Sequence, residues 1–272
     1  MVETIHPGTS APFARVAVFD FDGTVSLIRA GWADIMLPQM LEALTALGTG
    51  ESHDDLRRAV EPIVWRLNGK DTLYQMIALA EEVTLRGGTP LDPREYKQEF
   101  LNRLFAVSHP RLQQLRDGSC KPDQYLVPGT RALLEDLRAR GLRLYLASGT
   151  DDAQLKEEAG LLDVTRYFDG GVYGALPDPG AFSKRILMER ILRRPGMRPH
   201  HVIGFGDGPV EIEELKRAGA LGVGLATDEP ECRETSSWKR RNLIEVGADY
   251  IIPNYLCRGV LLPMLFAHHE PI

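Results

Sequence analysis

The sequence predicts an α/β protein with a mostly parallel sheet and an inserted domain made only of helices. Three observations predict this class. Short apolar runs that suit buried parallel strands alternate with helical patterns in the second half of the chain. One more such run stands alone near the N-terminus. Between residues 27 and 124, helical periodicity is continuous and no strand pattern occurs. A Rossmann-like core with helices on both faces of the sheet and a helical insertion explains all three.

The expected elements follow in chain order. Apolar runs that stop abruptly at polar clusters predict buried strands at 15–19, 142–147, 201–205, 221–225 and 249–252. Amphipathic patterns between these runs predict core helices at 129–140, 151–159, 183–193, 210–218 and 236–246. Four further apolar stripes predict the helices of the insertion, near 32–47, 56–67, 73–83 and 96–105.

Domain boundaries follow from the same patterns. Residues 1–14 are rich in Pro, Gly, Ser and Thr, and we expect a loose N-terminal tail there. Residues 15–26 and 125–272 are predicted to form the α/β core. Residues 27–124 are predicted to form the helical insertion. The chain therefore leaves its core after the first strand and returns to it before the second.

Composition narrows the class of protein. The chain has 272 residues, of which 43% are hydrophobic and 26% charged, as in an average soluble globular protein. Its net charge is -6, which argues against nucleic acid as a partner. No apolar run reaches the roughly 18 residues of a membrane span, and the N-terminus lacks a signal-peptide pattern. Three cysteines without CxxC spacing argue against a disulfide framework or a zinc site and favour a cytoplasmic location.

The segment Asp20–Thr24 (DFDGT) carries the strongest chemical signal. It directly follows the first apolar strand, and strand residues two apart share a face, so Asp20 and Asp22 are expected to face one point. Two such carboxylates repel each other unless a cation or a shared proton lies between them. Mg²⁺ prefers oxygen ligands and can bridge carboxylate and phosphate. The alternative is a strand followed by an ordinary Asp-Gly turn.

Three other segments at strand or helix ends have the chemistry of a phosphate site. Asp207 follows the third strand and could complete a metal site, with Glu211 as a ligand through water or as a brace. Ser148 and Gly149 end the second strand, where a hydroxyl and a backbone amide beside a helix start suit an anion. Lys184 near the start of a helix could neutralise the phosphate, and its neighbour Arg185 competes for that role. Each segment alone also fits a plain turn, helix cap or solvated side chain.

Taken in this order, the segments resemble the haloacid dehalogenase-like superfamily, of the phosphatase type with a helical type 1 cap, as in phosphoglycolate phosphatase and β-phosphoglucomutase. The resemblance spans residues 16–253. The first motif, DxDGT, is matched in full, Ser148 fits the second and Lys184 the third. Asp207 fits the fourth, GDxxxD, but Glu211 stands where the motif has its second Asp. That replacement affects the geometry of one ligand.

The resemblance implies a mechanism for hydrolysing a small phosphomonoester. It assigns Asp20 as a nucleophile that forms an aspartyl-phosphate, and Asp22 as the acid that protonates the leaving group and then activates water. It assigns Mg²⁺ to Asp20, the carbonyl of Asp22 and Asp207, with Glu211 nearby. Ser148, the Gly149 amide and Lys184 would hold the phosphoryl oxygens. Phosphoryl transfer depends mainly on such positioning and charge.

Other functions share parts of this pattern. A phosphomutase uses the same core motifs, so the core alone does not separate it from a phosphatase. A carbon–halogen hydrolase lacks the second acid that Asp22 supplies, and a receiver domain lacks both DxDGT and the long insertion. A catalytically inactive phosphate-binding or scaffold protein is a further alternative. The substrate is expected to be a small phosphorylated metabolite, a sugar, polyol or acid phosphate. Polar residues of the insertion that could contact it are Lys70, Thr72 and Tyr74.

Overall fold

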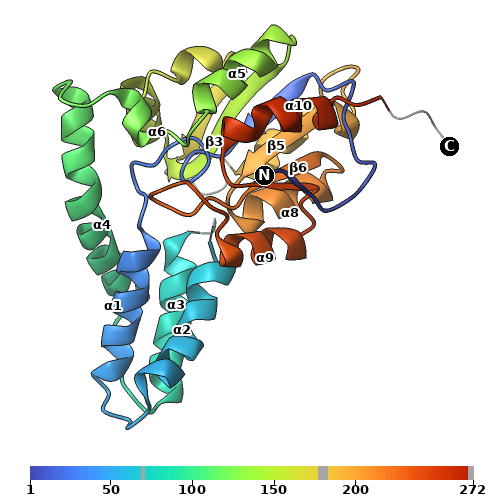
Figure 1. Cartoon of the computed structure of the whole chain (residues 1–272). Helices are drawn as coiled ribbons and strands as arrows, with labels where there is room; N and C mark the ends of the chain where they lie inside the picture. The colour runs from blue at the N-terminus through green and yellow to red at the C-terminus, as the bar shows by residue number, and fades with distance from the viewer. Residues whose placement is uncertain (69–70, 177–182, 269–272) are drawn as a thin grey trace. The chain divides into compact units, whose positions relative to one another are not determined.

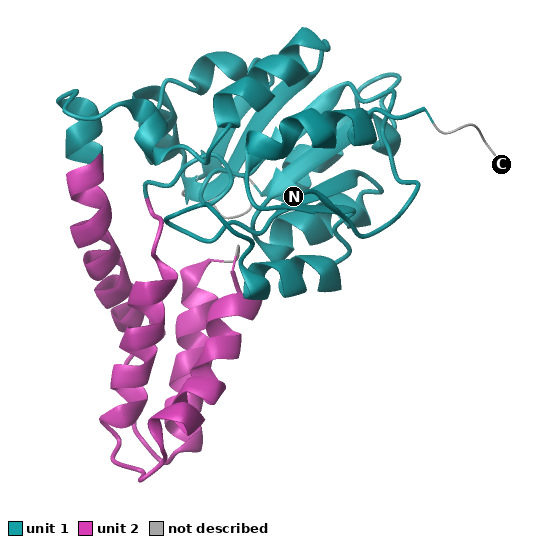
Figure 2. Ribbon diagram, viewed as in Figure 1, with its two compact units in different colours: residues 1–28, 112–272 teal, residues 29–111 magenta. Residues whose placement is uncertain are grey.

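The computed structural model describes residues 1–68, 71–176 and 183–268. Contacts divide the chain into two compact units (Figure 2). The core unit contains residues 1–28 and 112–272, and the helical unit contains residues 29–111. The helical unit is shorter than the expected insertion at 27–124, because residues from Leu112 onward contact the core unit. Arg116, for example, pairs with Glu157 at 2.6 Å.

The core unit is built on a seven-stranded sheet whose order along the sheet is β1-β7-β6-β5-β2-β3-β4. All neighbouring strands are parallel except β1, which pairs antiparallel with β7. The sheet places β2 at its middle, between β3 and β5. The strands are β1 (Glu3–Thr4), β2 (Val16–Phe19), β3 (Arg143–Asp151), β4 (Gly171–Ala175), β5 (Val202–Gly206), β6 (Leu221–Leu225) and β7 (Tyr250–Ile252).

Helices cover both faces of this sheet (Figure 1). One layer packs α7, α8 and α9 against the strands, and α5 and α10 lie on the opposite face. The fold class predicted from the sequence is therefore confirmed. The α-helices of the core unit are α5 (Thr130–Ala139), α6 (Asp152–Leu161), α7 (Lys184–Leu192), α8 (Pro209–Arg217), α9 (Ser237–Glu245) and α10 (Arg258–Leu265).

Alternation along the strands explains the two layers. Val16 belongs to the hydrophobic cluster that α7 and α8 complete with Leu187 and Ile212. The Phe19 ring instead stacks on Phe205 with centroids 4.5 Å apart. All of these side chains are at most 3% exposed. Full burial of one such side chain contributes about 1.5–3 kcal/mol to the stability of the fold. Because both faces of the central strands are buried in this way, the strands stay fixed even where the polar residues of the sheet edge follow them.

Some elements differ from the sequence-based expectation. β4 and α10 were not predicted. Residues 1–14 do not form the loose tail that we expected, because Glu3 and Thr4 pair with β7 and Ala11 is buried. The Ala11 amide also donates a hydrogen bond to the Leu265 carbonyl at 2.7 Å. Backbone pairing and one small apolar side chain anchor this segment, although its composition is that of a linker.

The helical unit contains α1 (Ala33–Thr45), α2 (His53–Arg66), α3 (Thr72–Leu85) and most of α4 (Pro93–Arg116). Its apolar stripes meet in a core of their own, formed by Met36, Met40, Leu41, Leu44, Leu56, Val60, Val64, Met76, Leu79, Val83, Tyr96, Phe100 and Leu104. Among its described residues no strand is present. Helical periodicity in the sequence therefore correctly predicted that this unit consists of helices.

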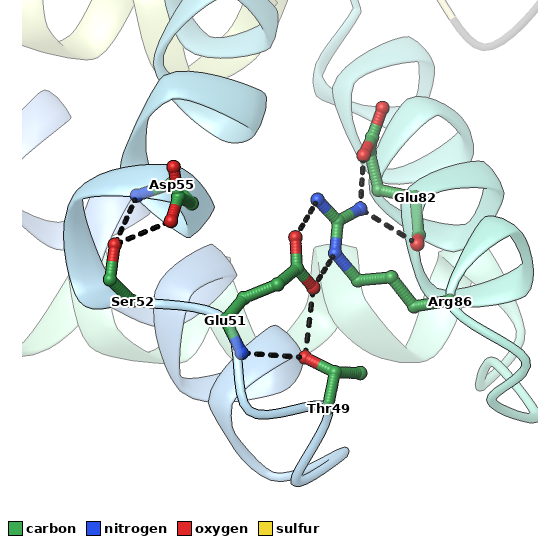
Figure 3. A network of polar contacts seen from close by, with 6 residues as sticks. All are labelled: Thr49, Glu51, Ser52, Asp55, Glu82 and Arg86. Carbon is green, nitrogen blue, oxygen red and sulfur yellow. Dashed lines mark hydrogen bonds and ion pairs between the residues drawn. The ribbon is translucent and has the colours of Figure 1, made fainter.

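A polar network closes one end of the helical unit (Figure 3). Arg86, which follows α3, donates from Nε to Glu51 at 2.8 Å and from its Nη2 to the same carboxylate at 3.0 Å. Its Nη1 contacts Glu82 of α3. Thr49 donates to Glu51, and Ser52 caps α2 by accepting from the Asp55 amide at 3.2 Å. The loop after α1 is thus fixed to the end of α3.

Candidate active site

Three strand ends meet at the carboxyl edge of the sheet. Phe19 of β2 lies level with Leu146 of β3 on one side and with Phe205 of β5 on the other. Asp20 is the next residue after β2, and its amide donates to the Phe205 carbonyl at 2.9 Å. Parallel pairing therefore brings the polar residues that follow β2 and β5, and those at the end of β3, to one edge, where open α/β sheets bind ligands.

Asp20 lies in contact with a partly buried lysine. The Asp20 carboxylate is 7% exposed, and Lys184 Nζ lies 2.6 Å from its Oδ1. Lys184 begins α7, whose N-cap Ser183 accepts from the Ile186 amide at 3.2 Å. Lys184 also contacts Oε1 of Glu211, in the first turn of α8. The second oxygen of Glu211 is buried without a hydrogen-bond partner. One ammonium group therefore bridges two buried acids.

Asp22 is held by the end of β3. Thr150 Oγ1 donates to Asp22 Oδ2 at 2.9 Å. The Thr150 amide in turn donates to Oγ of the buried Ser148 at 3.0 Å. The strand continues through Gly149 to Asp151, and Asp151 is the residue that caps α6. The hydroxyls of Ser148 and Thr150 therefore make hydrogen bonds at the site, and neither residue caps α6.

A glycine turn brings the chain close to a second acidic pair. Gly23 has a φ of +70°, and a Cβ there would lie 2.2 Å from Asp207 Oδ2 and 2.9 Å from Glu229 Oε1. Lys239 Nζ lies 2.8 Å from Asp207 Oδ2 and also contacts Glu229. The Lys239 side chain is 3% exposed and comes from α9. Lys239 thus bridges a second pair of buried carboxylates, those of Asp207 and Glu229.

Burial dominates the electrostatics of these groups. Removal from water raises the pKa of Asp20 well above its ordinary value, and the charges of Glu211 and Asp207 add to that effect while Lys184 opposes it. Burial likewise raises the pKa of Asp207 to about 6, against the opposing charge of Lys239. Burial alone would lower the pKa values of Lys184 and Lys239, but their carboxylate partners raise both above the usual lysine range. Both lysines are charged at neutral pH.

The acids at this edge fit a divalent cation. Glu211 lies close enough to Asp20 and Asp207 for its charge to raise the pKa of both, and all donor atoms of the three side chains are oxygens. Glu211 has an oxygen with no partner. In the described part of the chain no three acids, His or Cys are gathered in the arrangement of a formed metal site. Lysines instead occupy one oxygen each of Asp20, Asp207 and Glu211.

Comparison with known proteins gives the family. A model of the haloacid dehalogenase-like hydrolases matches residues 14–219, which is most of the chain. The chain belongs to this family. The resemblance inferred from the four motifs is confirmed, and the matched region includes Asp20, Ser148, Lys184, Asp207 and Glu211.

Relatives of this haloacid dehalogenase-like chain include two named phosphatases. A phosphorylated carbohydrates phosphatase of Thermotoga maritima is 32% identical over 34% of this chain and 42% of its own length. A phosphoglycolate phosphatase of Synechococcus elongatus is 25% identical over 61% of this chain and 84% of its own length. The chain thus spans less than half of the first relative.

A solved structure with the same fold is the hydrolase YfnB of Bacillus subtilis, which was determined bound to magnesium. It matches 92% of this chain and 98% of its own chain with a TM-score of 0.53.

 The two sequences are 15% identical over that match, so the likeness concerns the fold.

Among the described helices of this chain, none has the length and apolar content needed to cross a bilayer.

The structure places the predicted site residues as follows. Asp20, Asp22, Ser148, Gly149, Lys184, Asp207 and Glu211 all lie at or beside the carboxyl edge of the sheet in the core unit. Arg185, the competitor of Lys184, is exposed and pairs with Glu189 of its own helix at 3.1 Å. Gly149 is exposed at the end of β3.

The residues predicted from the helical insertion lie apart from this set in the chain. Thr72 begins α3, and Tyr74 follows in its first turn with 58% of its surface exposed. Lys70 lies outside the described residues. All three belong to the helical unit, so their part in the site stays a prediction.

Sequence reasoning missed Thr150, Glu229 and Lys239. Thr150 was visible as the third residue of the Ser-Gly-Thr segment, but its hydroxyl was not assigned to Asp22. Lys239 stands beside Arg240 and Arg241 in a helix, where a lysine is usually solvated. Glu229 lies in the loop after β6. No local pattern indicates that these two side chains turn inward and meet Asp207.

Proposed function

We propose that this protein is a Mg²⁺-dependent phosphatase that hydrolyses a small phosphomonoester through an aspartyl-phosphate on Asp20. The observation that carries the proposal is the pairing of Asp20 Oδ1 with Lys184 Nζ at 2.6 Å, at a sheet edge where Asp22 is also held. A charged lysine beside the carboxylate favours its ionised form against the effect of burial and offers a positive charge to the incoming phosphate. Membership of a hydrolase family supports this reading.

The first chemical step joins an Asp20 oxygen to phosphorus while the bond from phosphorus to the ester oxygen breaks. The carboxyl group of Asp22 gives its proton to the leaving alkoxide. Thr150 Oγ1 fixes the orientation of Asp22 from 2.9 Å. In the second step a water oxygen attacks phosphorus, its proton passes to Asp22, and the bond between phosphorus and Asp20 breaks. Inorganic phosphate leaves and both side chains return to their starting states.

Charge at the phosphoryl group is handled by the residues around Asp20. Lys184 faces the nucleophile, and we assign it together with Ser148 and the amide of Gly149 to the phosphoryl oxygens. Asp20, the carbonyl of Asp22, Asp207 and Glu211 would hold Mg²⁺. The ion, when bound, offsets negative charge on the phosphate and on the buried acids. Burial raises the pKa of Asp20, so a cation here would also favour its ionised form.

The substrate class is proposed from the relatives. One relative is named for phosphorylated carbohydrates and another for phosphoglycolate. A sugar, polyol or small acid phosphate would suit a site of this kind. We propose that the helical unit acts as the cap that selects the leaving group, with Lys70, Thr72 and Tyr74 as contacts. A phosphomutase remains the second candidate, because it requires the same core residues.

The test is a panel of phosphate esters assayed for released inorganic phosphate. We expect release from sugar or small acid phosphates with added Mg²⁺, and loss of that activity with EDTA that added Mg²⁺ reverses. Full activity in metal-free protein would contradict the metal assignment. Isomerised substrate without released phosphate would identify a mutase. Binding of esters without either product would identify a phosphate-binding protein.

A further inference from the structure

Two lysines, the buried Lys239 and the partly buried Lys184, each contact two acids of the site. Lys184 lies between Asp20 and Glu211, and Lys239 lies between Asp207 and Glu229. Four carboxylates with 8% or less of their side chains exposed therefore face two ammonium groups. With all four carboxylates ionised, the remaining two negative charges equal in magnitude the charge of one divalent cation. Lys239 therefore belongs to the charged groups of the site, although it has no role in the proposed chemical steps.

Lys239 has an environment unlike that of its neighbours on α9. Its side chain is 3% exposed, whereas the adjacent Arg240 is exposed and pairs with Glu3. A lysine is rarely buried unless its charge is paired. Lys239 Nζ has two carboxylate partners, Asp207 Oδ2 at 2.8 Å and Glu229 Oε1. The ring centroid of the adjacent Trp238 lies 5.7 Å from Lys239 Nζ.

The geometry around Gly23 shows why Asp207 needs a fixed partner. Asp207 Oδ2 and Glu229 Oε1 both lie within 3 Å of the point where a Cβ of Gly23 would stand. Two buried carboxylates that close repel each other. Lys239 lies in contact with both, so it removes the repulsion and holds Oδ2 on the side of α9. The other oxygen of Asp207, Oδ1, is then the one available to a cation.

We propose that Lys239, held by Glu229, is a positioning residue that orients Asp207 for divalent-cation binding. This inference rests on the proposed function, because it assigns Asp207 to the cation. Outer residues that orient metal ligands typically change metal affinity about 10–100-fold when they are replaced. Lys239 is such an outer residue, because its ion pair with Asp207 fixes the orientation of a carboxylate that we assign to the cation.

The sign of the effect separates this role from simple electrostatics. Replacing Lys239 with methionine removes a positive charge beside the cation site, and charge alone would then tighten cation binding. Loss of orientation would weaken it, because Asp207 and Glu229 would repel each other and Asp207 Oδ2 would lose its partner. We therefore expect Lys239→Met to bind the cation more weakly although its site is more negative.

The experiment measures Mn²⁺ binding to the full-length protein without substrate, by calorimetry and by the electron paramagnetic resonance signal of free Mn²⁺. Lys216→Met is the matched control. Lys216 Nζ lies 2.6 Å from Asp249 Oδ2, and Asp249 is 2% exposed. That variant also loses a buried ion pair to the same sheet, but one that contacts none of the site residues. We expect Kd for Mn²⁺ to rise about 10–100-fold in Lys239→Met and to stay unchanged in Lys216→Met.

Each outcome decides the inference. Unchanged or tighter Mn²⁺ binding in folded Lys239→Met would overturn it and leave the proposed function intact. Absence of Mn²⁺ binding in the wild type would instead contradict the metal assignment itself. If Lys239→Met does not fold, Lys239→Gln takes its place, because it removes the same positive charge but leaves a polar amide in the buried position. Weaker Mn²⁺ binding in Lys239→Gln supports the inference, and unchanged or tighter binding overturns it.

Discussion

Gly23 allows the chain to pass beside the buried acids at the sheet edge. Its φ of +70° favours glycine, and an added Cβ would lie 2.2 Å from Asp207 Oδ2. We expect Gly23→Ala to lose most phosphatase activity, because either Asp207 or the turn after Asp22 must move. The measurement is the rate of phosphate release at saturating Mg²⁺, together with the free energy of unfolding in urea.

The control for Gly23 is Gly141, between α5 and β3. Its φ of +82° carries a similar backbone strain, but nothing lies within 4 Å of an added Cβ. Alanine at either position is expected to cost about 1–2 kcal/mol of stability from the backbone alone. Gly141→Ala should keep its activity. Equal activity in both variants would show that the close approach of Gly23 to Asp207 has no part in catalysis.

Prediction from sequence at this scale depended on local spacing. Asp20 and Asp22 lie two apart after an apolar strand, so the sequence alone indicates that they share a face. Lys239 follows Asp207 by 32 residues and reaches it only through the packing of α9. No periodic pattern carries that contact, which is why the two inward-facing residues Lys239 and Glu229 were missed.

His201 offers a test at the scale of one element. It ends the short 3₁₀ helix η3 (Pro199–His201) directly before β5, is 7% exposed, and its Nδ1 accepts from the Arg198 amide at 3.2 Å. Burial, together with the neighbouring His200 and the positive charges of Arg15 and Arg198, lowers its pKa below the ordinary value. The folded state therefore favours neutral His201. Its contribution to stability is present above the unfolded pKa of about 6.5 and is lost as the pH falls through the folded pKa.

We expect the thermal midpoint of the wild type to fall when the pH is lowered from about 7.5 to about 5. His201→Asn keeps an acceptor near the Arg198 amide but does not titrate, so its midpoint should fall less. His53→Asn, which changes an exposed histidine at the start of α2, is the control and should keep the wild-type pH dependence. An identical fall in the wild type and in His201→Asn would contradict the assignment.

Elements with strong periodicity were the ones that the sequence predicted. All of the predicted helices and strands have a counterpart in the structure, most of them within a few residues of their expected bounds, although α4 extends to Arg116, well past the expected end at residue 105. β1 and β4 were missed because a two-residue strand and the run Gly171–Ala175 carry too little apolar sequence to indicate a strand. Their pairing partners, β7 and β3, stabilise them. Tertiary contacts therefore determine these edges of the sheet.

Specificity belongs to the scale of the whole molecule, because the core residues of the proposed mechanism would contact only the phosphoryl group and the cation. If the helical unit selects the leaving group, Tyr74→Ala should reduce activity on the best natural ester much more than on p-nitrophenyl phosphate. Loss of one polar contact costs about 1–3 kcal/mol. The matched control is Leu85→Ala, at the far end of α3, where the side chain is 77% exposed.

Two results would separate recognition from support of the fold. A change in the ranking of esters confined to Tyr74→Ala would assign Tyr74 to the leaving group. Equal losses on both esters would show that Tyr74 supports the helical unit and that selection lies elsewhere. Lys70→Ala and Thr72→Ala extend the same comparison to the other two predicted contacts.

The central claim is that Asp20 is the nucleophile, and trapping of the phosphoenzyme tests it most directly. The protein is mixed with its best ester and Mg²⁺, quenched in acid, and its intact mass is measured. We expect the wild type to carry one phosphoryl group on the peptide that contains Asp20, and Asp20→Asn to carry none. Asp22→Asn should keep its fold and turn over about 10²–10⁴-fold more slowly. Phosphate release at a near-normal rate by Asp20→Asn, or a phosphoryl group on another residue, would contradict the account.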